Sequence, residues 1–431
     1  MSATTEKPNV IIFGGLNTCS RSLAALLVPL EGERLVSHLR IVDKYSVSPP
    51  TTYLGAEFPK ILAQPDVEYR QVNLTVPSAV ASAFDPPEGQ AAYSYVFDLT
   101  GEIRYDRTEM IAIKMTFNVS RLVGLEAARR NVQAYVRLQL PVYESSEKST
   151  HDEKEDVKPA KPLDVWWHET VRMLSAIEGL NLVVLRVGFV YGPYIDFGIY
   201  TSVITVASVY GYMKKPMKTL WSPGKDPMYT VHSDDVAGGL WACAQWIAPL
   251  GRKEADIIAG EQILFHNEKS KVSEVEGMPP CDAKLIAPLF NLVRSAFKQF
   301  LDTSNSEFQQ VDDSEITLLK GGEIVTAYFG TTFEFHSFMI NAYAKANVVE
   351  EINEHHVGVW TEMLSSSNPP ITQTPLTAYM DTFTLSRHKL AYSNNKIKEV
   401  MGYKLKRPEF NHDTIKEIVE KWKAEGSWPN L

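Results

Sequence analysis

Residues 9–44 constrain the fold of this chain more than any other stretch. An apolar run at residues 10–13 is short and rich in β-branched residues, as in a buried strand. Gly14 and Gly15 break this run, a helical apolar pattern follows, and a second apolar run ends on Asp43. The order strand, glycine turn, helix, strand and acid is typical of a βαβ unit that binds a dinucleotide. The acid is then placed to hold a ribose hydroxyl.

The glycine fingerprint of that unit is incomplete. A GxxGxxG reading that begins at Gly14 finds Asn17 and Ser20 where the second and third glycines belong. Those glycines let the backbone approach the pyrophosphate and let helix and strand pack closely. Asn17 tolerates left-handed backbone angles better than most residues, and Ser20 is small. Two interpretations therefore stay open, a turn that still binds a nucleotide and a turn that only packs.

Composition and charge exclude several function classes. The chain has 431 residues, 44% of them hydrophobic, which is enough for one large domain and a smaller one. The net charge of -9, without a long basic run, argues against nucleic acid as a partner. Three scattered cysteines suggest a reducing compartment. No apolar run is long enough for a membrane span, and the first nine residues do not resemble a signal or transit peptide. We therefore expect a cytoplasmic protein.

Apolar periodicity predicts alternating strands and helices as far as about residue 250. We expect strands at residues 67–72, 93–99, 132–140, 181–189 and 228–232, and helices at 109–130, 164–177, 200–214 and 233–246. This order predicts a Rossmann-like, doubly wound parallel sheet in residues 1–250. Residues 251–431 read mainly as a smaller C-terminal lobe that covers the substrate, with some later segments returning to the sheet. We expect a strand at residues 257–263 in this part, and helices at 283–301, 337–356 and 414–425. The charged stretch 144–161 reads as an exposed, mobile loop.

Polar and small residues at strand ends extend the predicted nucleotide site. Asn73 follows the third expected strand, where a doubly wound sheet places an adenine ring; a simple strand cap is the alternative. Thr100 and Gly101 follow the fourth, and their small size would let a cofactor pass close above the sheet. The predicted cofactor-binding residues are therefore Gly14, Gly15, Asn17, Asp43, Asn73, Thr100 and Gly101.

Further motifs follow in a specific order. They are Asp-Leu-Thr-Gly at 98–101, LRVGFVYGP at 185–193, TVHSDDV at 230–236 and a Ser-Asn-Asn-Lys…Gly-Tyr tail at 393–403. Together with the glycine turn, they resemble the extended short-chain dehydrogenases/reductases, the NAD-dependent epimerase/dehydratase group. A branch from fungi and other eukaryotes looks closest, through Glu102, Asn-Glu-His-His at 353–356 and Trp360. The resemblance covers nearly the whole chain. It implies NAD(H) or NADP(H) as cofactor and a small-molecule substrate.

The chain departs from this family at the catalytic motif. Family members usually carry Ser or Thr at the end of the fifth strand and Tyr-x-x-x-Lys on the next helix. Here the first position falls on Leu138 or Gln139, and the tyrosine and lysine positions fall on Leu163 and Trp167. A leucine cannot donate a proton, and an indole N–H does not titrate usefully. Because losing a positioned general acid costs about 10²–10⁴-fold in rate, the ordinary redox mechanism is not expected.

The replacements predict an apolar, aromatic pocket that suits an apolar molecule better than a nucleotide sugar. Its expected lining is Leu138, Gln139, Leu163, Trp166, Trp167 and Phe189. His168 and Tyr143 are candidate replacement acids or bases, with Tyr191 of the VYGP motif as a third. The plainer interpretations are a surface histidine at position 168 and a wall residue at position 191. No metal site is expected, because the adjacent pair at 355–356 has no third ligand at a suitable spacing.

Three functions stay open. The first is an enzyme of specialised metabolism that isomerises, dehydrates or cyclises an apolar molecule, with or without a tightly held nucleotide. The second is an NAD(P)-dependent oxidoreductase with a relocated proton donor. The third is a non-catalytic binding or scaffold protein. Asp43 favours NAD over NADP and Lys44 beside it opposes that preference, so cofactor choice stays open. A homodimer is compatible with the sequence.

Overall fold

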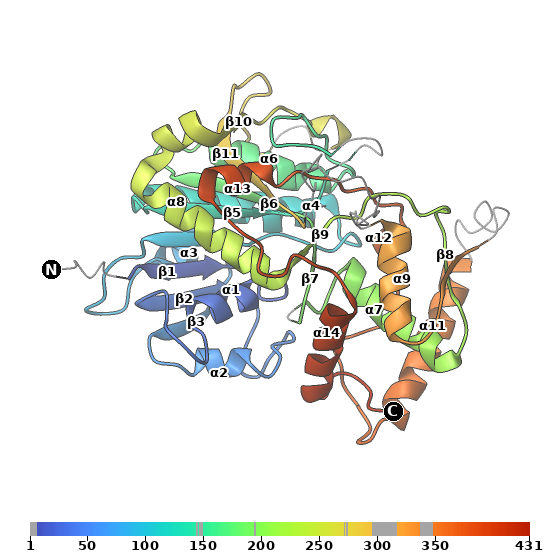
Figure 1. The fold of residues 1–431 in the computed structure, drawn as a ribbon. Helices are drawn as coiled ribbons and strands as arrows, with labels where there is room; N and C mark the ends of the chain where they lie inside the picture. Colours follow the sequence, from blue (N-terminus) through green and yellow to red (C-terminus); the bar gives the residue numbers. More distant parts are fainter. Residues whose placement is uncertain are drawn as a thin grey trace, which may run out of the picture.

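The computed structural model describes residues 7–143, 145, 150–193, 195–270, 272, 275–294, 317–336 and 348–431. An eight-stranded sheet lies at its centre, in the order β10-β11-β6-β5-β4-β1-β2-β3 (Figure 1). Seven of its strands run parallel to one another: β1 (Asn9–Phe13), β2 (His38–Asp43), β3 (Val67–Gln71), β4 (Tyr95–Asp98), β5 (Ala134–Gln139), β6 (Leu182–Val187) and β11 (Ile286–Leu292). The edge strand β10 (Gly260–Gln262) is antiparallel to β11. The predicted Rossmann-like sheet is confirmed.

Helices cover both faces of this sheet. The long helix α8 (Ser233–Ala259) packs with α1 (Ser20–Leu27) on one face. On the other face lie α3 (Pro77–Ala83), α5 (Val119–Arg129) and α6 (Asp164–Ser175). Short helices α2 (Phe58–Leu62) and α4 (Glu109–Ala112) complete this part, and α4 continues through a π-helical turn, η1 (Ile113–Asn118), into α5. Each face is therefore sealed by its own apolar cluster.

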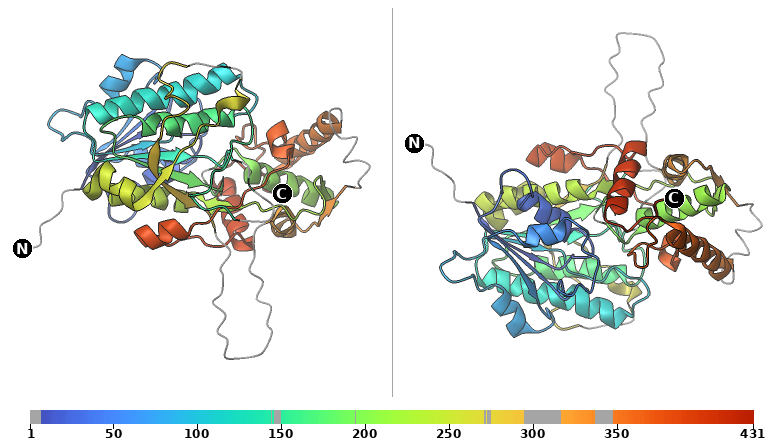
Figure 2. Two further views of the ribbon diagram at one scale, coloured as in Figure 1. Left: turned by 90° about the horizontal axis from the view of Figure 1, so that it is seen from above. Right: turned by 90° about the horizontal axis from the view of Figure 1, so that it is seen from below.

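A smaller lobe lies beyond the carboxyl ends of the strands (Figures 1 and 2). Its helices are α7 (Ile199–Met213), α9 (Leu318–Tyr328), α11 (Val348–Ser366), α12 (Thr382–Leu385) and α14 (His412–Ala424). Its short strands pair as β8 (Met217–Thr219) with β12 (Phe333–Phe335) and β7 (Phe189–Tyr191) with β9 (Thr230–His232). Helix α13 (Asn395–Met401) returns to the sheet and buries Ile397 there. The lobe has a separate aromatic core, in which Trp422 stacks on Trp428.

Two predictions from the sequence were wrong in the described residues. The first was a helix at 283–301, because residues 286–292 form strand β11 beside β6; residues 295–301 lie outside the described part. An apolar run of seven residues is compatible both with a helix and with a strand that is buried on both faces. Parallel pairing with β6 selects the strand. The second was full exposure of the loop 144–161. Glu153 is 5% exposed there and accepts a hydrogen bond from the Asn291 N–H (2.7 Å), so this part lies over the strand ends.

One further prediction is only partly covered. The predicted helix at 337–356 is present from Val348 as part of α11, and residues 337–347 lie outside the described part. Within the described ranges, no helix has the length and apolar character needed to cross a membrane.

Candidate functional site

The residues predicted to bind a cofactor line one cavity at the glycine turn. The cavity measures about 110 Å³ and is bounded by all seven of them, namely Gly14, Gly15, Asn17, Asp43, Asn73, Thr100 and Gly101. Gly14 and Gly15 both have positive φ, +70° and +72°. A Cβ added to Gly14 would lie 2.8 Å from Thr100 Cα, and one added to Gly15 would lie 2.7 Å from Leu99 Cβ. The turn therefore needs both glycines to cross the end of β4.

Asp43 fixes the glycine turn from the end of β2. Its carboxylate accepts the Leu16 N–H (3.0 Å) and the Lys44 N–H (2.6 Å), and the residue is 4% exposed. Burial raises the pKa of Asp43, and the backbone N–H groups oppose that shift. The backbone N–H of Tyr45 also stabilises the ionised carboxylate. Because a carboxylate has about four acceptor positions, one remains for a ligand hydroxyl.

Among charged residues, sequence reasoning placed only Asp43, with Lys44 beside it, at the cofactor site. Lys44, Arg104 and Arg107 line it together with Glu102, so cations outnumber the acids Asp43 and Glu102 by three to two. Arg104 and Arg107 lie in the loop after the Thr100-Gly101 end of β4. This place in the loop was the only feature of the sequence that could have assigned them to the cavity. The excess positive charge favours a ligand that carries phosphate.

Trp167 closes this region on the side of α6. Its indole lies so close over Gly101 that a Cβ there would be 2.4 Å from the ring. The indole N–H donates to the Glu102 carbonyl (3.1 Å), and the Arg137 guanidinium lies 4.8 Å from the ring centre. The side chain predicted to replace the family's lysine is thus held between the ends of β4 and β5.

A buried ionic network lies directly beneath Trp167. Arg137 and Asp98 are both fully buried and form an ion pair (3.0 Å). Asp98 also accepts hydrogen bonds from Tyr135 Oη (2.7 Å) and Thr100 Oγ1 (2.6 Å), and Arg137 donates to the Thr100 carbonyl (2.7 Å). The network therefore fixes the turn that follows β4.

Two of the three predicted acid–base residues meet at the end of β5. Gln139 Nε2 donates to Tyr143 Oη (3.1 Å), and Tyr143 Oη lies 3.2 Å from His168 Nδ1. His168 Nε2 lies 2.6 Å from the Leu264 carbonyl, so we assign the proton to Nε2 and let Nδ1 accept from Tyr143. Burial lowers the pKa of His168 to about 4 and raises the pKa of Tyr143 to about 12, so both are neutral at pH 7. The cavity beside them measures about 30 Å³, close to the space of a single water.

Burial of neutral His168 should make stability depend on pH. The pKa of His168 is about 4 in the folded chain and near 6.5 when unfolded, so the unfolded state binds more protons between these values. We therefore expect the free energy of unfolding to fall as pH drops from 6.5 towards 4. His168→Asn should make that fall smaller in urea titrations at pH 7 and pH 4.5. An identical fall in the variant would contradict this account; exposed His412→Asn is the control.

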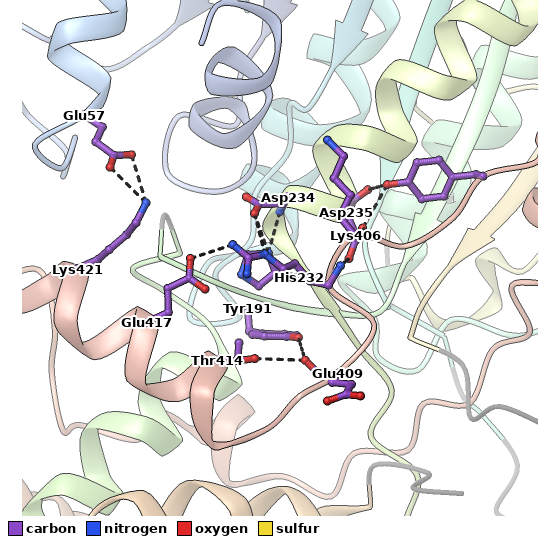
Figure 3. Close-up of polar contacts among 12 residues, drawn as sticks. Glu57, Tyr191, His232, Asp234, Asp235, Lys406, Glu409, Thr414, Glu417 and Lys421 are labelled. Carbon is purple, nitrogen blue, oxygen red and sulfur yellow. Dashed lines mark hydrogen bonds and ion pairs between the residues drawn. The ribbon is translucent and has the colours of Figure 1, made fainter. Parts of the chain in front are cut away.

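Tyr191, the third candidate, lies away from the other two. It is 1% exposed and donates to the Glu409 carbonyl (3.3 Å), which also accepts from Thr414 Oγ1 (Figure 3). Its ring packs edge-on against His232 and Phe410. His232 accepts the Asp234 N–H (3.1 Å) and so caps α8. In this position Tyr191 joins the sheet domain to the C-terminal segment.

The six residues predicted to form an apolar pocket are not brought together. Leu138 packs under α8 on one face of the sheet, whereas Leu163 and Trp166 pack on the other. Trp167 and Phe189 belong to the core of the lobe. Gln139 alone among the six lines the 30 Å³ cavity. The aromatic side chains of Trp166, Trp167 and Phe189 therefore pack in the apolar cores and do not line a shared pocket.

A cavity that sequence reasoning missed lies inside the C-terminal lobe. It measures about 470 Å³, and its walls come from α7, β8, α9, α11 and residues 380–388. Most of its lining is apolar, including Val203, Val206, Met217, Leu318, Phe333 and Met380. Four of the ten histidines of the chain, His336, His355, His356 and His388, also line it. The apolar face of residues 200–214 and the pair at 355–356 were visible in the sequence, but nothing showed that they share one space.

The polar groups of this lobe cavity are largely paired. His356 Nε2 lies 3.0 Å from Tyr210 Oη, and His388 Nε2 lies 2.6 Å from the Phe383 carbonyl. Arg387 holds Asp226 through two contacts of 2.8 Å each. Burial lowers the pKa values of His356 and His388 to about 4, so both imidazoles are neutral at pH 7. Within the described ranges, no cluster of His, Cys, Asp or Glu is arranged to hold a metal ion.

Comparison with known proteins supports the fold. No family profile and no curated protein matches the chain at the level of sequence. Among solved structures, the Bordetella bronchiseptica enzyme WbmG in complex with NAD is 10% identical, with a TM-score of 0.59 over 99% of this chain and 98% of that one. UDP-glucose 4-epimerase from Thermotoga maritima with UDP-glucose is 12% identical, with a TM-score of 0.58 over 96% and 99%. A Streptomyces venezuelae dTDP-glucose 4,6-dehydratase (DesIV double mutant) with NAD is 13% identical, with a TM-score of 0.58 over 97% and 98%.

These neighbours are enzymes of the NAD-dependent epimerase/dehydratase type, on the short-chain dehydrogenase/reductase fold. The chain shares that fold over nearly its full length, as the resemblance implied. At this level of identity the likeness defines the fold, and function has to be argued from the sites.

Proposed function

We propose that the protein acts on an apolar small molecule held in the lobe cavity, by isomerisation, dehydration or cyclisation and without hydride transfer. The observation that carries this proposal is the cavity itself. Its volume of about 470 Å³ lies within the range of roughly 300–1,000 Å³ typical of small-molecule sites. Its lining is mostly apolar with a few polar groups, which is also typical of such sites.

The site at the strand ends argues against hydride transfer. A nicotinamide nucleotide, as bound by several neighbours, supplies a hydride donor or acceptor. Hydride transfer by this fold needs room beside the nicotinamide and a group that moves a proton. Trp167 covers Gly101, and the space beside Tyr143 and His168 holds about 30 Å³. The NAD bound by WbmG supports a nucleotide site at the glycine turn, where the cavity residues suit a nucleoside better than a whole dinucleotide.

Neutral imidazoles give the lobe cavity its chemistry. His356 is 3% exposed and is paired with Tyr210, and both line the cavity. A neutral imidazole beside a phenol can accept or return a proton without placing a fixed charge among apolar side chains. Asp226 and Arg387 neutralise each other, and the two other charged lining residues, Lys218 and Glu351, have opposite charges. The lining therefore has no net charge, which favours an uncharged ligand. These features suit proton-transfer chemistry on a neutral, largely apolar molecule.

Filling part of the cavity should weaken ligand binding. Val203 on α7 lines it, and a tryptophan there would occupy part of the space. With the neutral fluorescent probe N-phenyl-1-naphthylamine, we expect V203W to weaken binding by about tenfold or more, which corresponds to about 1.4 kcal/mol. V357W is the matched control, because Val357 is 36% exposed and does not line the cavity. Equal probe affinity in unaltered chain and V203W would contradict the proposal.

A non-catalytic binding role is the second candidate. It is favoured by the closed hydrogen-bond chain from Gln139 through Tyr143 and His168 to the Leu264 carbonyl, which fills the usual reaction site of the fold. An extract of apolar metabolites incubated with the protein separates the two roles by mass spectrometry. An enzyme would convert an excess of one compound, whereas a binding protein would retain a stoichiometric amount unchanged.

A further inference from the structure

We propose that residues 381–386 form a lid over the lobe cavity, which opens to admit the ligand and closes over it. This inference rests on the function proposed for the lobe, because a lid has a role only if the cavity takes up a ligand. The lid contains α12 and lies where the lobe meets the sheet domain (Figure 1). Its small burial, its anchored ends and its contacts with Trp221 and Tyr105 carry the proposal.

The lid covers the cavity with little burial of its own. Thr384, Leu385 and Ser386 line the cavity, and they lie in α12 or directly after it. None of the four residues of α12, all of which the structure describes, is buried. Asp381 accepts the Thr384 N–H through its side chain (2.7 Å) and the Leu385 N–H through its carbonyl (3.0 Å), so the turn can move as one piece. A turn without a buried residue loses little apolar contact when it moves.

Both ends of the lid are anchored to buried residues. Before the lid, the Asn353 side chain accepts the Met380 N–H (2.8 Å) and donates to the Met380 carbonyl (2.9 Å). After the lid, the Arg387 guanidinium holds the Asp226 carboxylate through two contacts of 2.8 Å each. Asn353 and Asp226 are both buried. Fixed ends on either side of a weakly buried segment are what a hinged lid requires.

Trp221 is the fixed edge against which the lid closes. It lines the cavity, is 38% exposed, and donates its indole N–H to the Leu385 carbonyl (3.0 Å). Its φ is +69°, a conformation that bulky residues rarely adopt. The Trp221 carbonyl accepts the Gly224 N–H (2.9 Å), and the Gly224 carbonyl accepts the Leu319 N–H of α9 (2.9 Å), so this strained turn is fixed to the lobe. Strain that the surroundings maintain points to a functional position.

Phe383 joins the lid to the sheet domain. Its ring is not among the described groups that line the cavity, and it stacks on Tyr105 in the loop after β4, with ring centres 4.1 Å apart. The Lys161 ammonium lies 4.3 Å from the centre of the Phe383 ring and 3.3 Å from Ser386 Oγ. The Phe383 carbonyl lies 2.6 Å from His388 Nε2. Each of these contacts is individually modest, so the closed lid is favoured and can still open.

Thiol labelling inside the cavity tests whether the lid opens. Val203→Cys places a thiol on the cavity wall, and Cys281→Ser removes the exposed cysteine. Methyl methanethiosulfonate should label position 203 at least about tenfold more slowly than it labels Cys281 in the unaltered chain, because it enters only through the minor open state. Cys19 and Cys243 are buried and should stay unlabelled, which shows that the chain is folded. Labelling at position 203 as fast as at Cys281 would overturn the proposal.

Weakening either contact of the lid should speed this labelling. Trp221→Phe removes the indole N–H and Phe383→Leu removes the stacked ring, so each should raise the labelling rate at position 203 about two- to tenfold. Trp241→Phe, in an apolar cluster of the sheet, is the matched control and should leave the rate unchanged. An unchanged rate in both lid variants would overturn the proposal. No ligand takes part in this measurement, so its result does not depend on the proposed function.

Stopped-flow mixing with N-phenyl-1-naphthylamine shows whether the lid controls ligand entry. In Phe383→Leu, the association and dissociation rate constants should both rise about two- to tenfold, with the affinity within about twofold, because the same lid closes over the free and the bound cavity. A changed affinity with an unchanged association rate constant would contradict a lid. Labelling that responds to Phe383→Leu in a chain that binds no probe would contradict the proposed function and still support the lid.

Discussion

Asp98→Asn should lower the free energy of unfolding by about 3–5 kcal/mol, because it leaves the buried Arg137 guanidinium without its counter-charge. Both side chains are fully inaccessible to solvent, and their ion pair measures 3.0 Å. The same carboxylate organises Tyr135 and Thr100, so the substitution also weakens the turn after β4. Urea unfolding followed by circular dichroism measures the effect. The slope of the transition should stay the same if folding remains two-state.

Two comparisons show whether the charge is the cause. Asp66→Asn makes the same chemical change at a half-exposed ion pair with Arg34 (3.7 Å) and should have little effect. The double variant Asp98→Asn, Arg137→Met removes the orphaned cation, so it should be more stable than the Asp98→Asn single variant. A double variant less stable than the single one would mean that packing, and not charge, gives the network its importance.

Gly101→Ala should cost about 3 kcal/mol or more, the sum of overpacking against Trp167 and backbone strain. The new methyl group would lie 2.4 Å from two atoms of the indole, and Gly101 has a φ of +146°. Trp167 cannot retreat easily, since Glu102 and Arg137 hold it. Thermal or urea unfolding of the purified variant measures the loss.

The reason for the Gly101 effect can be separated into its two parts. In the Trp167→Ala background the clash is absent, so Gly101→Ala should then cost only the backbone strain of about 1–3 kcal/mol. Gly179→Ala is the control for strain without a clash, because its φ is +77° and a Cβ there meets no atom within 4 Å. Equal costs for Gly101→Ala in the two backgrounds would contradict the close contact.

Much of the sheet domain was predictable because its signals are local. Buried strands, glycine turns and amphipathic helices follow each other from residue 9 to the end of α6, and a few adjacent residues are enough to predict each of them. Strand β11 was missed because its assignment depends on pairing with β6, which no local pattern shows. Glu153 was expected to be exposed because a charged run is normally solvated; its acceptance of the Asn291 N–H is a long-range contact.

The same distinction between local signals and long-range contacts explains which sites were predictable. Residues of the glycine turn gather in one cavity because the carboxyl ends of parallel strands meet at one edge, a rule of the fold. The predicted aromatic pocket assumed that neighbouring large side chains face one space, yet Trp166 and Trp167 belong to different apolar clusters. The lobe cavity needed packing among α7, α9 and α11, whose relative positions have no signature in the sequence.

The C-terminal segment also sets the order in which this chain can fold. Asp235 at the start of α8 accepts hydrogen bonds from the N–H groups of Lys406 (2.6 Å) and Arg407 (3.0 Å), and Lys421 on α14 reaches Glu57 on α2 (3.2 Å) (Figure 3). These partners lie 171, 172 and 364 residues apart along the chain. Residues 57 and 235 are synthesised long before residues 406–421, so the surfaces around Asp235 and Glu57 stay exposed to solvent until the C-terminal segment has emerged. Emergence of residues 406–421, and not synthesis of the sheet, is therefore the step at which the two lobes can pack against each other.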